Sequence, residues 1–231
     1  MVQKHSQAVP QGERLQARRR EILAAASVLF RSHGFHSTGM RDIAAAAEMT
    51  VGNLYYYFEN KQDLLAFCQE DAVRRLLEIA EHIMQVRLDA ASSLWNLIVG
   101  HIRCLNEGVP GSIAHLEVEE LEAPARRRIV RLRDQYERIL RSIVQRGCRE
   151  GVFSETDAAL AVHAILGAAN GTVQWYRPRG RVPLTRIAHA FATQLVRGLI
   201  VPGATFEPPA ENTLDSRNEL VESVTPQGGH A

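Results

Sequence analysis

The sequence of 231 residues has few cysteines and no long apolar run, and each scarcity excludes a class of protein. Its three cysteines, Cys68, Cys104 and Cys148, are widely separated and form no Cys-x-x-Cys pair. They argue against a disulfide framework and a structural zinc site, and favour a reducing compartment. No apolar stretch approaches the roughly 20 residues that span a bilayer, and the first residues lack a signal-peptide core. We therefore expect a cytoplasmic protein.

The signatures of common enzyme classes are also missing. The sequence has no Gly-x-Ser-x-Gly, no His-Glu-x-x-His and no glycine-rich phosphate loop. Its histidines His82, His101, His115 and His163 are scattered, which favours places in the core or on the surface over a metal site. We therefore predict that the protein is not an enzyme, that it needs no cofactor and that it binds no metal.

The charges that are present are unevenly distributed. The net charge is only +1, but residues 1–61 carry eight Lys or Arg against five Asp or Glu, whereas the remainder is slightly acidic. A basic N-terminal end suits a polyanionic partner.

Apolar residues recur with helical spacing along most of the chain, and no strand-like alternation is found. The expected helices are residues 13–33, 40–47, 51–57, 61–86, 90–106, 112–121, 124–150, 156–176 and 184–201. The predicted fold class is therefore all-α, with about nine helices. We divide the chain into a disordered arm (1–12), a helix-turn-helix head (13–60), a helical body (61–201) and a disordered tail (202–231).

Residues 38–61 form the pattern around which this division is made. Two short helices, 40–47 and 51–57, are separated by a tight turn at Glu48 and Met49. This is the spacing of a helix-turn-helix unit, whose second helix can enter the major groove of DNA. Thr38 and Thr50 are expected to cap the two helices.

Each residue expected to face DNA has a physical reason. Thr38 and Arg41 begin a helix, where amides and positive charge favour a phosphate. The first turn of the second helix points at the groove floor, where Asn53 can contact base edges. The phenolic hydroxyls of Tyr55 and Tyr57 can donate hydrogen bonds to phosphates. For Tyr55 the alternative is that its side chain packs within the protein and does not reach DNA. The predicted DNA-contacting residues are Thr38, Arg41, Thr50, Val51, Gly52, Asn53, Tyr55, Tyr56, Tyr57 and Lys61, the last as a phosphate clamp. Arg18, Arg19 and Arg20 are either a solvated face or a further contact.

These residues resemble the TetR family of bacterial transcriptional regulators. The matching positions are Phe30, Gly34, Phe35, Thr38, Asp42, Ile43, Ala44, Leu54, Tyr55, Phe58 and Lys61. Glu48 departs from the family's usual glycine, and a positive φ is tolerable there. The resemblance implies a homodimeric repressor that binds a palindromic DNA operator and is released by a small-molecule effector. It assigns ligand binding and dimerisation to residues 61–201.

The last two expected helices carry a stripe of small and aromatic residues that permits close helix packing. We predict a dimer interface of Ala164, Ala168, Gly171, Trp175, Phe191 and Leu195. The alternative is that this stripe packs only within one subunit.

A second stripe, His163, Asn170, Gln174 and Arg177, is polar and is predicted to line a ligand cavity. Residues 167–180 resemble the acyl-CoA-responsive branch of the family, which represses fatty-acid and sterol-ring degradation genes. That resemblance implies an acyl-CoA effector, with arginines on its phosphates. For the arginines of residues 126–133, the alternative to binding phosphates is that they form a solvated face and pair with nearby glutamates. Two other functions stay open, a repressor of an efflux system responding to aromatic or cationic compounds, and a regulator that binds a partner protein.

Overall fold

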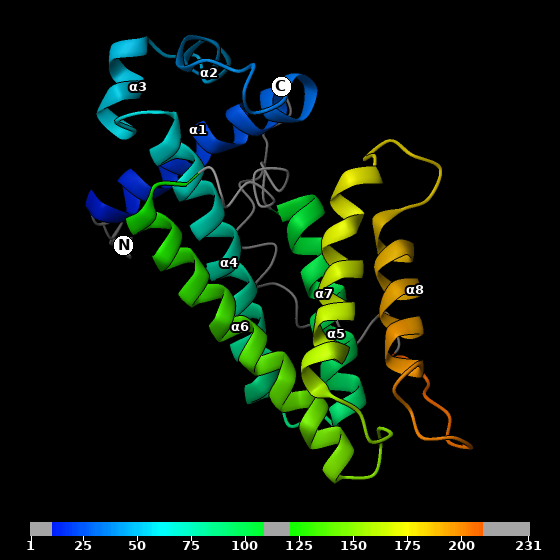
Figure 1. Cartoon of the computed structure of the whole chain (residues 1–231). Coiled ribbons are helices and arrows are strands. Elements are labelled where there is room, and N and C mark those ends of the chain that lie inside the picture. The colour runs from blue at the N-terminus through cyan, green and yellow to red at the C-terminus, as the bar shows by residue number, and fades with distance from the viewer. Residues whose placement is uncertain (1–10, 109–120, 210–231) are drawn as a thin grey trace, which may run out of the picture.

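A computed structural model describes residues 11–108 and 121–209 (Figure 1). The α-helices in these residues are α1 (Gln11–His33), α2 (Met40–Ala46), α3 (Val51–Tyr57), α4 (Lys61–Gln85), α5 (Ala90–Arg103), α6 (Ala123–Arg149), α7 (Ala158–Trp175) and α8 (Leu184–Arg197). A short π-helix, η1 (Cys104–Gly108), continues α5. Within the described ranges the chain has one isolated β-bridge, Phe153 to Ile200, and no strand. The predicted all-α class is confirmed.

Helices α1, α2 and α3 form the head, which closes on the first turns of α4 (Figure 1). Its core contains Phe30, Ile43, Leu54 and Phe58, all buried. Gly34 ends α1 with φ +82°, the left-handed conformation that glycine adopts without strain. Glu48 has φ +53° in the turn between α2 and α3, so the position where the family usually has glycine is indeed left-handed.

The body comprises the rest of α4 together with α5 to α8. Helix α4 runs from the head into the body, where it packs against α5 and α6 (Figure 1). Helix α5 is buried on most of its surface and packs most extensively against α8. The buried Trp95 indole of α5 donates to Thr193 Oγ1 of α8 at 3.0 Å. No helix in the described residues is both long and apolar enough to cross a membrane.

Several boundaries differ from the prediction, and α8 ends at Arg197 rather than at residue 201. Helix α1 begins at Gln11, so the end of the expected disordered arm is helical. Residues 104–108, which follow α5, adopt π rather than α geometry. Phe206 of the expected tail is buried against the body, and Arg197 donates to its carbonyl oxygen at 3.4 Å. The ordered chain therefore extends beyond residue 201. The expected helix 112–121 lies outside the described residues except for Leu121, as does the rest of the tail, 210–231.

Candidate functional site

Helix α3 presents its first turn and two tyrosines to solvent. Thr50 is the N-cap, as predicted, and its Oγ1 accepts a hydrogen bond from the backbone N–H of Asn53 at 3.2 Å. This cap leaves the Asn53 side chain exposed, one residue after the exposed Gly52. Tyr56 is 74% exposed. Leu54 points the other way, into the head core, so the packing fixes which face of α3 is offered outward.

The three tyrosines have unequal exposure. Tyr55 is half exposed and Tyr56 more so, whereas Tyr57 is partly buried against the head core. The rings of Tyr56 and Tyr57 meet edge to face, with centroids 5.1 Å apart. Val51 is likewise partly buried. Of the four, Tyr55 and Tyr56 are therefore the side chains best placed to reach a ligand outside the head.

At the start of α2 the structure differs from the prediction. The N-cap is Gly39, whose amide donates to Asp42 Oδ2 at 2.8 Å. Thr38 is only 3% exposed, and its hydroxyl donates backward to the carbonyl oxygen of Gly34 at 2.8 Å. The predicted cap at Thr38 is therefore wrong, because its hydroxyl closes the end of α1 instead. Arg41, one turn away, is exposed.

Lys61 is held in the interior of the head loop. Its Nζ donates to the carbonyl oxygens of Phe35, Thr38 and His36 at 2.8, 3.1 and 3.3 Å. The ammonium also lies 4.4 Å from the centre of the Phe35 ring, a cation–π distance. All three N–H groups are thus engaged, and Lys61 joins α4 to the loop between α1 and α2. The arrangement offers no support for the predicted phosphate clamp.

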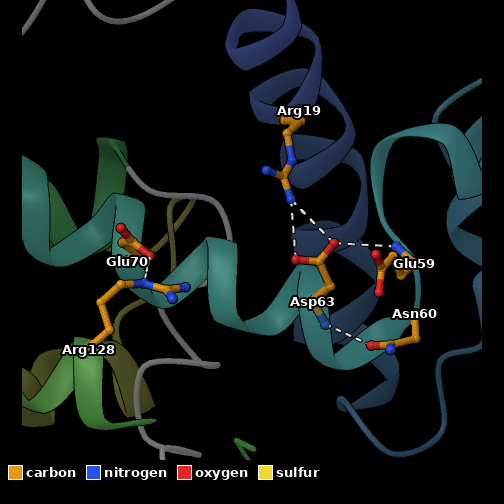
Figure 2. Close-up of polar contacts among 6 residues, drawn as sticks. All are labelled: Arg19, Glu59, Asn60, Asp63, Glu70 and Arg128. Atoms are coloured by element: carbon orange, nitrogen blue, oxygen red, sulfur yellow. Dashed lines mark hydrogen bonds and ion pairs between the residues drawn. The ribbon is translucent and has the colours of Figure 1, made fainter. Parts of the chain in front are cut away.

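Two of the three neighbouring arginines on α1 bind α4. Arg19 Nη2 lies 3.3 Å from Asp63 Oδ1 (Figure 2), and its guanidinium stacks 4.5 Å from the rings of both Phe58 and Phe67. Arg20 Nε donates to Asp71 Oδ1 at 2.9 Å. Arg19 and Arg20 therefore hold α1 against α4. This structural role was not predicted, and it does not decide between a solvated face and a DNA contact for the arginines.

The body contains a buried polar network that joins three helices. His101 of α5 contacts Tyr136 Oη of α6 through Nδ1 at 3.0 Å and Asn170 Oδ1 of α7 through Nε2 at 3.0 Å. An amide oxygen only accepts, so Nε2 carries the hydrogen and Nδ1 accepts from Tyr136. Burial lowers the pKa of His101 to about 4, which keeps the ring neutral at pH 7. One turn farther, Asn106 of η1 donates to Thr172 Oγ1 at 2.8 Å.

Only Asn170 of the predicted ligand stripe joins this network. His163 is largely exposed and lies 3.6 Å from Glu137 Oε1 of α6. Gln174 and Arg177 are exposed, and Arg177 donates to the backbone carbonyl oxygens of Gln174 and Tyr176. Of the four, His163 contacts α6, Asn170 contacts α5, and three of the side chains are exposed. The structure therefore does not bring these four side chains together around one cavity.

Sequence reasoning missed His101, the partner of Asn170, and the polar groups near it. His101 and Asn106 follow the apolar run of α5, and Thr172 lies in the apolar α7, which was the available signal. Tyr136 lies among charged residues of α6 and carried none. Such groups are retained in a core when they are hydrogen-bonded to one another or to a ligand. Their meeting point beside a π-helix, a geometry often found at functional sites, makes the network a candidate ligand-contacting region.

The predicted dimer residues lie on α7 and α8, which run side by side (Figure 1), and they form a partly exposed apolar face. Trp175 is 49% exposed and its ring centre lies 5.9 Å from that of Phe191. Ala164 is exposed, whereas Ala168, Gly171 and Leu195 are partly buried. Leu160, one turn before Ala164 and 67% exposed, extends this face and was not predicted. Exposed apolar faces are typical of interaction sites, so this one is a candidate interface.

Known proteins resemble both parts of the chain. The model of bacterial regulatory proteins of the tetR family matches residues 22–67, and that of the tetracyclin repressor-like C-terminal domain matches residues 87–199. The HTH-type transcriptional repressor KstR2 of Rhodococcus jostii is 28% identical over 188 residues, which are 80% of this chain and 92% of that protein.

Solved structures resemble the whole arrangement. The TetR family transcriptional regulator PfmR from Thermus thermophilus is 31% identical, with a TM-score of 0.71 over 76% of this chain and 97% of that one. The structure of AibR in complex with isovaleryl coenzyme A and operator DNA, 24% identical, has a TM-score of 0.68 over 80% of this chain and 99% of that one. This last similarity is one of fold.

Proposed function

The chain belongs to the TetR family of bacterial transcriptional repressors, not to an enzyme class, and we propose that it binds a palindromic operator as a homodimer and is released by an acyl-CoA. The observation that carries the DNA-binding part of this proposal is α3. It is capped at Thr50, anchored by Leu54 and exposed along its first turn. That is the geometry with which a recognition helix enters the major groove.

Contacts with DNA divide into those that position the head and those that read sequence. We assign the exposed Asn53 amide to base edges, because it can both donate and accept in the groove. Arg41, Tyr55 and Tyr56 are exposed around it and suit phosphates, which fix the register of the head. Thr38 and Lys61 support these contacts by holding the loop between α1 and α2.

Dimerisation through the apolar face of α7 and α8 supplies the second head. Two copies related by a two-fold axis would bury this face against itself, with Trp175 and Phe191 as its large side chains. Aromatic side chains of this kind contribute most to interface affinity. A two-fold dimer presents its α3 helices to the two halves of a palindrome.

The effector proposal rests on the chemistry of the body. The core in which α5 packs is mainly apolar and includes the hydrogen bonds of His101, and this combination suits an acyl chain carrying a carbonyl oxygen. Exposed arginines of α6, Arg131 and Arg138, line an open hollow of about 430 Å³ along that helix together with Asp134, and their guanidinium groups suit CoA phosphates. AibR, whose fold this chain shares, forms a complex with isovaleryl coenzyme A and operator DNA, and this supports an effector of the same chemical class here.

The proposal is tested by DNA binding followed by release. A palindromic operator is first selected in vitro from random DNA, and its affinity for the protein is measured by fluorescence anisotropy. Oleoyl-CoA and isovaleryl-CoA are then titrated, with free CoA and the matching fatty acids as controls. We expect release by a thioester and by neither half alone, with a coupling of about 1–3 kcal/mol. Failure to select any palindrome overturns the DNA-binding part. Release by an aromatic cation in place of the thioesters overturns the effector part.

A further inference from the structure

Three consecutive residues of α4 connect it to the head on one side and to the body on the other. Asp71 is buried, and its carboxylate accepts from Arg20 Nε of α1 and Arg75 Nε of α4, both at 2.9 Å. Gln69, also buried, accepts through Oε1 from Arg133 Nη2 of α6 at 3.2 Å. Residues 69–71 therefore bind helices on both sides of the division between head and body.

Glu70 makes the shortest of these connections. Its Oε2 accepts from Arg128 Nε of α6 at 2.6 Å (Figure 2), while Oε1 accepts from Arg74 of α4 at 2.7 Å. Partial burial alone would raise the pKa of Glu70, but the hydrogen bonds and charges of the two arginines lower it below its ordinary value. The carboxylate is therefore ionised at neutral pH and binds both arginines as an anion.

Arg128 stands beside an apolar contact between the same two parts. The next residue, Ile129, is fully buried, and it belongs to the core that contains Phe30, Ile43 and Phe58 of the head. Ala125 packs against that core one turn earlier. The first turns of α6 are thus a component of the head, and the Glu70–Arg128 pair lies where α6 enters it.

We propose that Glu70 and Arg128 are positioning residues for operator recognition, which fix the angle of the head on α6 and thereby the half-site spacing that the dimer accepts. This rests on the proposed DNA-binding function. The apolar contact of Ile129 is non-directional and does not by itself prevent the head from tilting. A charged hydrogen bond has a preferred geometry and restricts that tilt. Because half-sites lie about 34–36 Å apart, a small tilt moves α3 out of register with one of them.

The test compares Arg128→Gln and Glu70→Gln with the unchanged protein on a set of operators. The set contains the selected palindrome and versions lengthened or shortened by one base pair at the centre. A head that is free to tilt loses conformational entropy when it binds DNA. We therefore expect affinity for the selected operator to fall roughly 3- to 10-fold. The preference for that operator over the altered spacings should fall as well. The dependence of affinity on salt should stay unchanged, since no phosphate contact is lost.

Arg74→Gln is the matched control. It removes the other arginine from the same carboxylate, but both residues belong to α4, so head and body remain joined. We expect its spacing preference to equal that of the unchanged protein. Exchange of the two charges, Glu70→Arg with Arg128→Glu, should restore the spacing preference that either single change reduces. The two glutamine substitutions combined should cost less than the sum of both.

Each outcome bears on one proposal. Unchanged spacing preference in both glutamine variants, with the unchanged protein selective, overturns the positioning role and leaves the proposed function intact. Absence of palindrome binding by the unchanged protein overturns the proposed function itself. Thermal unfolding is measured in parallel. Failure of both single variants to fold also overturns the proposal, because Arg128 is half exposed and a pair that only sets an angle is not required for folding.

Discussion

Lys61 Nζ lies 2.8 Å from the carbonyl oxygen of Phe35 and 4.4 Å from the centre of the Phe35 ring. One side chain at the start of α4 therefore binds both the backbone and the aromatic face of Phe35, the second residue after α1. The same ammonium also binds the carbonyl oxygen of Thr38. The loop that positions α2 is held by α4, so movement of α4 must move α2 as well.

Replacing Lys61 should affect folding more than phosphate contact. We expect Lys61→Ala to lower the free energy of unfolding by about 1–3 kcal/mol, since three carbonyl oxygens lose their donor. Affinity for the operator should fall with little change in its dependence on salt. Arg41→Ala, at an exposed position, should instead reduce the slope of log affinity against log salt by about one. A reduced slope for Lys61→Ala would restore the phosphate clamp to this residue.

Asn53 and Thr50 separate recognition from helix capping. Asn53→Ala should relax base preference at one position of each half-site, at a cost of about 1–3 kcal/mol for the preferred base. Thr50→Ala removes the hydroxyl that accepts from the backbone N–H of Asn53 and should destabilise the head by about 0.5–2 kcal/mol. Binding to a library of single-base operator variants distinguishes the two. Equal weakening on every sequence by Asn53→Ala would exclude base recognition by its amide.

The oligomeric state tests the apolar face of α7 and α8. Trp175→Glu places a charge beside Phe191 and should convert dimers into monomers at micromolar concentration. Met84→Glu is the control, because Met84 is comparably exposed but lies on α4. Sedimentation equilibrium measures both variants. A dimer that persists in Trp175→Glu would place the interface elsewhere.

His101 should make the body sensitive to acid. Its pKa is about 4 in the folded protein against 6.5 for the free side chain, so the unfolded chain binds more protons between these values. The stability contributed by the neutral ring is complete above pH 6.5 and is lost as the pH falls toward 4. The loss amounts to roughly 3 kcal/mol. His101→Gln cannot titrate, so its urea-unfolding free energy should fall less over this range than that of the unchanged protein. Parallel pH curves would contradict the burial of a neutral His101.

Local signals in the sequence predicted the head well. The bounds of α3 follow from the cap at Thr50 and its apolar anchors, and α1 ends at residue 33, as expected. The role of Thr38 was not predictable, because its hydroxyl is close in sequence both to the end of α1 and to the start of α2. Only the structure shows that it bonds the end of α1. Lys61 and Phe35 are 26 residues apart, and Glu70 and Arg128 are 58 apart. No local rule connects such pairs, so their roles required the tertiary structure.

The buried position of Ile129 affects how genes of this kind can recombine. A chimera joined at residue 61 would combine the head of one relative with the α6 of another. Ile129 of that α6 would then pack into a head core with different side chains. The exchanged head would meet either a cavity or an overpacked contact at that point, and both reduce stability. Exchange of DNA specificity between relatives therefore requires transfer of the first turns of α4 and of α6 together with residues 11–60. The residues that build the head therefore come from two segments that are separated in the sequence.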